Sequence, residues 1–443
     1  MIEGVKQHKW WGWGEEGIDF SHADKPKFRP FVLEKLGVDI DEPAPGVRDF
    51  DSLDVPESRL PDTLRSVLVA ALGEHYVVDD PQTRVVHAFG RGVRDLIRIR
   101  RGQLGRVPDI VVYPGSEQDV VAVVNAACDA DAVVIPYGGG SNIAGALPDE
   151  KRPVISVNLG RMNRVLEIDA ASGLARIQCG VLGPDLELQL NARGWTLGHF
   201  PDSFVWSTLG GWIATRSSGM QSDKYGDIAD LTRGLRMAMD PQVLDLRPLP
   251  STSSGPSVRE MVIGSEGRLG IITEAWVHVH RLPQVREIQA YFFPSYDEGL
   301  VAMEQIAASD AAPSITRIMD SNETAFSMAN GKQSTRVGHL LSTAIRKVME
   351  RKGWDLNQIC LALVGYEGSA VHVRYEKSLV AKIISRNRGM GVGKGPGALY
   401  DQKKFDVPYI RDFLLDRGIP ADVSETATPW SGLKRMHDNT VAA

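Results

Sequence analysis

The sequence has 443 residues, a formal net charge of −6 and 24% charged residues. A chain of this length is expected to form two or three domains, because single cores rarely grow beyond roughly 250 residues. Its charge is spread without a basic stripe, which argues against nucleic acid as a partner. No apolar run approaches the roughly 18 residues that cross a bilayer, and the amino terminus lacks a signal-peptide pattern. We therefore expect a cytoplasmic protein without a transmembrane segment.

The cysteines and histidines do not predict a metal site. Cys128, Cys179 and Cys360 lack the close spacing of zinc ligands or of a disulfide framework. His278 and His280 share one face of an expected strand, but no third ligand accompanies them. We expect reduced thiols, and we assign no metal.

Residues 1–60 are expected to form an arm rather than a domain. Lys9-Trp10-Trp11-Gly12-Trp13-Gly14 places three tryptophans beside glycines, and residues 41–46 form a proline-broken linker. Three indoles are a large apolar surface, so we expect the arm to dock on the rest of the protein. Residues 61–104 form a helical segment, and the basic residues at 94–101 are expected on a solvated face.

Residues 105–285 alternate strands and helices. A strand is expected at 109–113, followed by a helix that Ser116 caps, with acidic Glu117 and Asp119 in its first turn. Further strands are expected at 133–135, 154–159, 165–169, 174–179 and 271–280, and a helix at 183–192. The strand at 133–135 delivers the chain into a glycine-rich loop, which is the order that a phosphate-binding turn requires.

Three glycine-bearing stretches are the most informative feature of the sequence. They are Pro136-Tyr137-Gly138-Gly139-Gly140-Ser141-Asn142, then Pro201-Asp202-Ser203 with Thr208-Leu209-Gly210-Gly211-Trp212-Ile213-Ala214-Thr215, then residues 264–274 with Glu266, Gly267, Gly270, Ile271 and Ile272. Small residues next to regular structure leave backbone N–H groups uncovered, as at a site for a pyrophosphate or the edge of a flat ring. Each stretch alone could be a flexible turn or a site of close helix packing.

The order of the three stretches resembles the FAD-binding domain of the vanillyl-alcohol-oxidase type of flavoprotein. This resemblance implies an α+β fold with a two-subdomain PCMH-type FAD-binding domain at 105–285, in which the three stretches bind FAD. Covalent flavoproteins of this class carry histidine where Gly140 stands here, so the resemblance implies a non-covalently held FAD.

Residues 286–443 are expected to form the substrate or cap domain. Strands at 287–293, 314–319 and 358–366 alternate with helices at 296–308 and 340–351. This order resembles the antiparallel sheet, covered by helices, that caps the flavin in the same class. A cap excludes water, which protects a reduced flavin and strengthens local electrostatics.

Within this class the whole chain resembles the alkyldihydroxyacetonephosphate synthase family. The resemblance rests on Trp11-Gly12-Trp13-Gly14, Arg106–Val111, Gly198–Ser203, Thr208–Trp212, Arg216-Ser217-Ser218-Gly219-Met220, Tyr225-Gly226-Asp227-Ile228, Arg317-Ile318-Met319-Asp320, Tyr409-Ile410-Arg411-Asp412, Glu425-Thr426 and Pro429-Trp430. It implies that a fatty alcohol replaces the acyl group of acyl-dihydroxyacetone phosphate without net oxidation. His199 would lie near the flavin, and Arg317 and Arg411 would bind the anionic substrate, because guanidinium binds phosphate bidentately. For each arginine, a structural ion pair is the alternative.

The family continues past Pro429-Trp430 with a catalytic tyrosine and a run of histidines followed by Gly-Val-Gly-Lys, which this sequence lacks. We therefore expect an incomplete cap and little alkyl transfer, with His199 the first candidate for proton transfer. One alternative is an FAD-linked dehydrogenase for a small 2-hydroxy acid, and another is an inactive flavoprotein remnant. Expected partners are a small-molecule or lipid substrate; peripheral membrane contact and a homodimer are left open.

Overall fold

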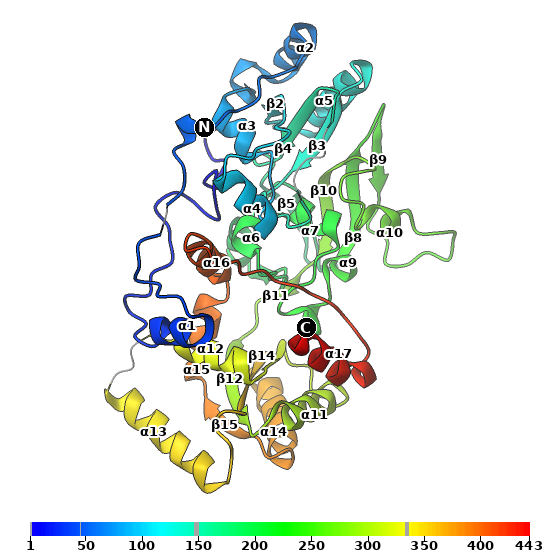
Figure 1. Cartoon of the computed structure of the whole chain (residues 1–443). Helices are drawn as coiled ribbons and strands as arrows, with labels where there is room; N and C mark the ends of the chain where they lie inside the picture. The colour runs from blue at the N-terminus through cyan, green and yellow to red at the C-terminus, as the bar shows by residue number, and fades with distance from the viewer. Residues whose placement is uncertain (1, 45, 146–149, 333–335) are drawn as a thin grey trace.

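The computed structural model describes residues 2–44, 46–145, 150–332 and 336–443, with only the backbone described for 336–342. A first sheet lies near the amino-terminal end of the molecule (Figure 1). Its strand order is β1 (Val77–Val78), β2 (Ile110–Val112), β4 (Val154–Asn158) and β3 (Val133–Tyr137), the last three parallel. Helices α2 (Asp62–Leu72) and α5 (Glu117–Asp129) pack together beside it.

Local sequence signals account for the strand–helix–strand order of this sheet. The Ser116 hydroxyl accepts a 3.1 Å hydrogen bond from the Asp119 amide, and the Asp119 carboxylate bonds back to Ser116 N–H, which forms the expected capping box. The parallel strands β2 and β3 are joined through α5. The β3 strand therefore ends at the first glycine stretch, as the sequence predicts.

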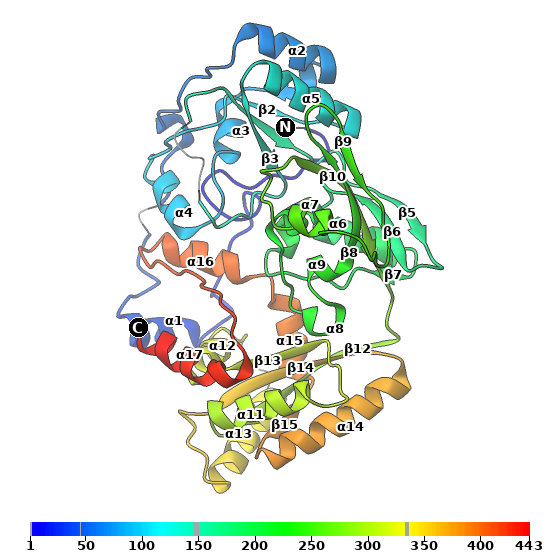
Figure 2. The same ribbon diagram turned by 90° about the vertical axis from the view of Figure 1, so that its right-hand side faces the viewer.

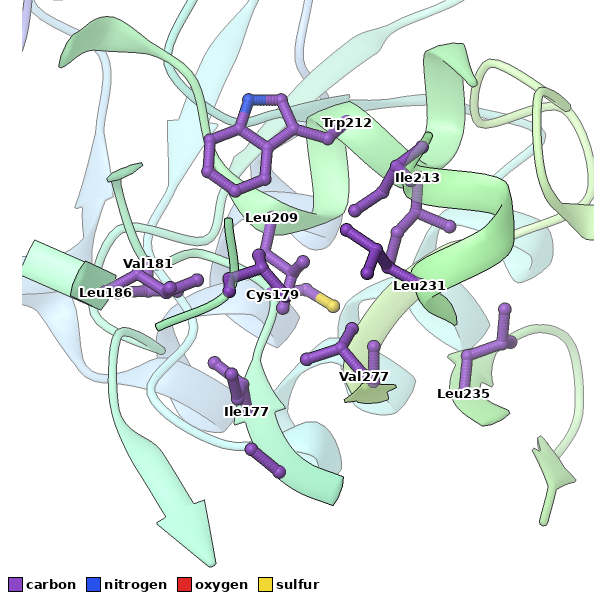
Figure 3. Close-up of a cluster of buried hydrophobic side chains, with 14 of the residues drawn as sticks. Ile177, Cys179, Val181, Leu186, Leu209, Trp212, Ile213, Leu231, Leu235 and Val277 are labelled. Atoms are coloured by element: carbon purple, nitrogen blue, oxygen red, sulfur yellow. The ribbon is translucent and has the colours of Figure 1, made fainter. Parts of the chain in front are cut away.

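The other two glycine stretches lie at a second, antiparallel sheet: the second stretch leads into a helix packed on it, and the third leads into one of its strands. Its order is β5 (Val165–Asp169), β6 (Leu174–Gln178), β10 (Ile271–His278), β8 (Thr232–Ala238) and β9 (Val243–Leu246). Helices α6 (Gly183–Asn191), α7 (Leu209–Thr215) and α9 (Ile228–Leu231) share its core. Figure 3 shows Leu209, Trp212 and Ile213 of α7 gathered around Cys179 in this core, above side chains of β6 and β10.

The cap contains a four-stranded antiparallel sheet covered on both faces. Its order is β13 (Ile315–Met319), β14 (Cys360–Gly368), β12 (Val285–Phe293) and β15 (Met390–Gly393). Helices α11 (Tyr296–Ala307) and α14 (Ala370–Arg386) lie on one side, and α12 (Ser321–Ala329) and α15 (Gly395–Lys403) on the other (Figure 2). Since both faces are covered, all residues of β14 except Gly368 are buried, which explains the unbroken apolar run at 359–364.

The arm at the amino terminus docks on the molecule, as expected. Trp10 and Trp13 are 4% and 3% exposed. Helix α1 (Phe28–Leu36) packs against α16 (Val407–Leu415) through a core that includes Phe28 and Ile410. The apolar payload of the tryptophans is thus removed from water.

The expectation of a solvated basic face at 94–101 is wrong for one of its residues. In helix α4 (Val93–Arg100), Arg94 is exposed, but the Arg100 side chain is only 11% exposed and pairs with Asp416, at 3.1 Å. Arg100 is buried because the tertiary structure places the carboxylates of α16 against α4. Asp416 lies 316 positions after Arg100, so no local sequence pattern predicts this ion pair.

The remaining elements are one long helix of the cap, α13, the terminal helix α17 and several short elements. They are α3 (Pro81–Val86), α8 (Ser222–Tyr225), α10 (Val258–Val262), α13 (Arg336–Arg351), α17 (Trp430–Ala442), β7 (Trp195–Thr196), β11 (His280–Arg281) and three single 3-10 turns at Phe50–Ser52, Glu74–Tyr76 and Phe204–Trp206. Sequence reasoning assigned no element after the strand at 358–366 and so missed α14 to α17, although the buried residues Val373, Val380 and Ile384 of α14 have helical spacing. Within the part of the chain that the structure describes, no helix has the length and apolar character needed to traverse a bilayer.

Candidate active site

The fold brings the three glycine stretches together. A Cβ at Gly139 would overlap the carbonyl of Trp206, and one at Gly138 would overlap the Thr208 hydroxyl. In the third stretch, a Cβ at Gly267 would lie 2.9 Å from Cγ of Pro136. Segments up to about 130 positions apart in sequence therefore form one surface, with glycines at the points of closest approach.

The lack of a side chain at Gly139 has a reason within the protein. The space that a Cβ of Gly139 would occupy is not open to a ligand. In the structure that space is filled by the main chain of Trp206 and Ser207. The absence of a side chain at Gly139 therefore serves protein packing, and it positions the loop rather than leaving room for a ligand.

The first stretch nevertheless presents uncovered donors. The structure gives no acceptor among the described residues for the amides of Gly139, Gly140 and Ser141. Gly140 has φ of 69°, the left-handed conformation that one residue of an anion-binding nest adopts. The hydroxyl of Tyr137 is also buried without a described partner, and burial raises its pKa, which keeps the phenol protonated.

Helix α7 begins at the second stretch. The Thr208 hydroxyl accepts a 3.2 Å hydrogen bond from the Gly211 amide and caps the helix. Gly210 packs on Cys179, because its Cβ would lie 2.9 Å from that of Cys179. Gly210 thus serves close packing, whereas Gly211 donates its amide hydrogen to the Thr208 helix cap, and the helix directs its amino end toward the first stretch.

The third stretch is held against the end of α7. The amides of Gly264 and Glu266 donate to the carbonyls of Ile213 and Ala214, each at 2.9 Å. At the end of this stretch, Ile271 and Ile272 lie in β10 with buried side chains, so only their backbone could face a ligand. The hydroxyl of Thr215 is used within α7, where it donates to the Gly211 carbonyl.

His199 is buried behind α7. It is 1% exposed, and its Nε2 lies 2.8 Å from the hydroxyl of Ser217, while its ring contacts Trp212 with centroids 5.0 Å apart. Burial lowers the pKa of His199 to about 4, so the imidazole is neutral at neutral pH. Its Nδ1 has no described partner. A neutral imidazole with one uncommitted nitrogen can accept or donate a proton.

Arg317 lies in β13 of the cap, close enough to Asp202 of the second glycine stretch for its charge to act on that carboxylate. Surrounding protein atoms raise the pKa of Asp202 by partly removing its carboxylate from water, and the positive charge of Arg317 opposes this rise. Part of the Asp202 residue is nevertheless exposed to solvent. Arg317 also forms an ion pair with Glu323 and lies 5.7 Å from the ring centre of Tyr400. With 40% of its side chain exposed, Arg317 remains available to an anionic ligand.

Arg411 lies elsewhere, between the arm and helix α4. One terminal nitrogen donates to the carbonyl of Arg91, at 2.7 Å, and the other pairs with Asp412, at 3.3 Å. Its guanidinium lies 6.0 Å from the ring centre of Trp13. These are the partners of a structural arginine, and none of the described contacts joins Arg411 to Arg317.

Sequence reasoning missed two residues that support the first stretch. The guanidinium of Arg91, fully buried, donates to the carbonyls of Gly12 and Gly90 at 2.9 and 2.8 Å, while its own amide donates to Asn142 at 2.5 Å. His8 lies against Trp206, with ring centroids 4.4 Å apart, and near the carbonyl of Gly139. Gly90-Arg91-Gly92 was the only local signal, since two glycines flank a charge in an apolar segment.

The fold and the donor set define an FAD-dependent enzyme of the two-domain FAD-linked oxidase class. A family described as "FAD binding domain" matches residues 108–242, and one described as "FAD linked oxidases, C-terminal domain" matches residues 282–443. The alkyldihydroxyacetonephosphate synthase of Dictyostelium discoideum is 37% identical over 98% of this chain and 75% of its own length. The chain belongs to the alkyldihydroxyacetonephosphate synthase family.

Solved structures agree with this assignment. A structure of an alkyldihydroxyacetonephosphate synthase matches with a TM-score of 0.91 and 35% identity, covering 99% of this chain and 83% of that one. A p-cresol methylhydroxylase structure matches with a TM-score of 0.56 at 16% identity, covering 81% of this chain and 70% of that one, which shows the fold alone. The PCMH-type α+β fold expected from the sequence is thus confirmed. The roles of individual residues and the domain boundaries stay predictions.

Proposed function

We propose that the protein is an FAD-dependent alkyldihydroxyacetonephosphate synthase of ether-lipid synthesis. It replaces the acyl group of acyl-dihydroxyacetone phosphate with a fatty alcohol. The alcohol oxygen forms the new bond to the first carbon, the acyl group leaves as a fatty acid, and no net oxidation occurs. The observation that carries the proposal is the family likeness over 98% of the chain, which includes both the glycine stretches and the cap.

The protein groups divide the work of binding. The uncovered amides of Gly139, Gly140 and Ser141 donate hydrogen bonds to the phosphate oxygens of FAD. When bound, FAD supplies ring-nitrogen chemistry at the first carbon of the substrate. The flavin is held without a covalent link, because Gly140 offers no nucleophilic side chain.

Arg317 binds the substrate phosphate. It is charged, and its ion pair with Glu323 is exposed enough to be exchanged for phosphate oxygens. His199 is neutral at neutral pH and handles a proton close to the flavin. Arg411 as a second phosphate ligand stays a prediction that its bonds to the Arg91 carbonyl and to Asp412 do not favour.

The experiment is exchange of a labelled long-chain alcohol into acyl-dihydroxyacetone phosphate by the FAD-loaded protein. We expect label in the ether product and one fatty acid released per product molecule. This outcome would contradict the expectation of little alkyl transfer that was drawn from the sequence. A matched sample receives lactate or glycolate under anaerobic conditions. Bleaching of the flavin there, without exchange in the first sample, would instead identify a 2-hydroxy-acid dehydrogenase, and a colourless protein that binds no FAD would identify an inactive remnant.

A cytoplasmic location, peripheral membrane contact and a homodimer stay predictions. A lipid substrate with a long chain and an anionic head is consistent with peripheral contact, because both parts can be presented at a membrane surface. Cell fractionation and light scattering test the location and the assembly.

A further inference from the structure

Two sequence motifs, Arg216–Met220 and Tyr225–Ile228, have no part in the function proposed so far. They overlap the two ends of residues 217–225, which run from the region of His199 to the cap and which we call the coupling segment. The segment ends in the short helix α8. Its contacts on the two sides show what it connects.

On one side the coupling segment contacts the residues around His199. Ser217 bonds to His199 Nε2, and the amide of Met220 donates to the carbonyl of Phe200, at 3.0 Å. The ring of Tyr225 lies on Gly198, where an added Cβ would be 2.6 Å from the ring carbons. Gly198 has φ of 76°, so the turn that precedes His199 depends on a glycine covered by this ring.

On the other side the coupling segment is bound to one carboxylate of the cap. Glu367, at the end of β14 and 4% exposed, accepts hydrogen bonds from Gln221 Nε2 at 2.5 Å and from the Tyr225 hydroxyl at 2.6 Å. The ammonium of Lys224 donates to the main-chain carbonyl of Glu367, at 2.6 Å. Arg286 of β12 pairs with the same carboxylate, at 3.1 Å.

The cap also contacts the residue that follows His199. The guanidinium of Arg286 lies 5.5 Å, and the ammonium of Lys404 5.0 Å, from the ring centre of Phe200. Arg286 thus touches both the Glu367 carboxylate and the loop that carries His199. Cations over an aromatic face are attracted most strongly where water is excluded.

A buried carboxylate with several donors makes a stiff junction. Charge-assisted hydrogen bonds are short and directional, and in a low-dielectric interior each strengthens the others. Removing one partner leaves buried polar groups without a hydrogen bond, which the structure must relieve by moving. The coupling segment is the part most affected, since Gln221 and Tyr225 are two of the three groups that donate to the Glu367 carboxylate, beside Arg286.

We propose that Glu367 is a positioning residue for His199, acting from the cap through Tyr225 and the coupling segment. The inference rests on the proposed place of His199 beside FAD. It assigns the two unused motifs a role, because Ser217 and Tyr225 are the contacts through which the cap sets the position of the imidazole. The cap sheet and the FAD site then move as one unit.

The test uses Glu367→Gln, which keeps size but loses charge, and Tyr225→Phe, which removes one hydroxyl and keeps the ring on Gly198. The matched control is Glu287→Gln, whose carboxylate pairs with Lys377 and Lys394 within the cap. The FAD-loaded proteins are compared by imidazole 15N resonances and by kcat and KM for alkyl exchange. The resonance of His199 is identified by its loss in His199→Gln.

We expect both test variants to shift the His199 resonance and to lower kcat by up to about 100-fold, since small displacements of a reacting group have effects of this size. KM should change little, and Glu287→Gln should alter neither readout. Wild-type His199 resonance in both folded test variants would overturn the proposal. If Glu367→Gln does not fold, Tyr225→Phe decides.

The two readouts separate this inference from the proposed function. If no protein in the set exchanges alcohol, the resonances alone decide whether Glu367 positions His199, and the proposed function fails independently. A shifted resonance with unchanged kcat would support the positioning and would remove His199 from the reaction.

Discussion

The amide of Trp13 donates a hydrogen bond to the carboxylate of Asp412, with 2.6 Å between nitrogen and Oδ2, across 399 positions of sequence. Asp412 belongs to helix α16 of the cap and is 5% exposed. The neighbouring carbonyl of Gly12 accepts a hydrogen bond from the Arg91 guanidinium, and the Arg91 amide donates to Asn142 of the first glycine stretch. The arm therefore lies between the cap and the glycine loop and contacts both, so disturbing it should affect the FAD site.

Gly14→Ala should destabilise the protein more than Gly17→Ala. Both glycines have positive φ, of 79° and 84°, so alanine at either adds backbone strain of about 1–2 kcal/mol. Only at Gly14 would the Cβ also meet a neighbour, 2.6 Å from the Tyr409 hydroxyl, whereas nothing lies within 4 Å at Gly17. We expect a further loss of about 1–3 kcal/mol at Gly14. Thermal unfolding measures the stability of both variants, and equal losses of stability would show that Gly14 is not packed tightly against Tyr409.

Gly139→Ala should release FAD. Its Cβ would overlap the Trp206 carbonyl, so the loop must move and its phosphate donors with it. Loss of one charge-assisted bond, about 1.5–3 kcal/mol, weakens binding by about tenfold or more. The control is Gly395→Ala, where nothing lies within 4 Å of the new Cβ. Flavin fluorescence gives the Kd, and unchanged affinity would argue against this loop.

The same preparations test how the flavin is held. Denatured wild-type protein should release all of its FAD into the supernatant, because Gly140 cannot form a covalent link. Yellow colour in the washed precipitate would contradict this expectation.

Arg317→Lys should weaken substrate binding with little loss of stability. The charge remains but the bidentate fork is lost, so we expect KM for acyl-dihydroxyacetone phosphate to rise by roughly tenfold. Its ion pair is 40% exposed on the arginine side and is worth at most about 1 kcal/mol. Melting temperature and KM are measured together, with Glu323→Gln as the control for the ion pair.

Arg411→Lys provides the contrast. Its guanidinium joins the Arg91 carbonyl to Asp412 beside the arm, with 13% of the side chain exposed. We expect the larger fall in melting temperature here. A raised KM with an unchanged melting temperature would instead return Arg411 to the substrate site.

Stability should rise with pH between about 4 and 6.5, in part through His199. Burial lowers the pKa of the folded protein's His199 to about 4, while the unfolded chain keeps the ordinary value near 6.5, so the unfolded state binds more protons in this window. The stability lost on acidification is complete below about pH 4 and on the order of 3 kcal/mol. His199→Gln should flatten the slope.

His87 and His280, with pKa values also lowered to about 4 by burial, contribute to the same slope. The slope in His199→Gln should therefore be reduced but not abolished. The control His75→Gln, at an exposed position, should leave it unchanged. Unfolding free energies from urea titrations at several pH values measure all three proteins, and an unaltered slope in His199→Gln would show that its burial has no effect on stability.

Several features of the site were predictable because their signals are local. Ser116 and Asp119 form a capping box within four residues, and Thr208 caps α7 through its own hydroxyl. The position of Arg411 was not predictable. Its motif gave no sign that Arg91, 320 positions earlier, would supply the acceptor.

By itself, the sequence determined most strands of the three large sheets, the starts of α5 and α7 and the positions of the three glycine stretches, because β-branched runs, N-caps and glycine act through the conformations of neighbouring residues. Only the tertiary structure decided that Gly139 packs on Trp206, that Arg411 bonds to the Arg91 carbonyl, and that Glu367 holds the segment beside His199. These contacts join residues that are far apart in the sequence. The energy of a buried charged pair depends on the distance between its atoms and on its burial, and both are set only when the chain folds.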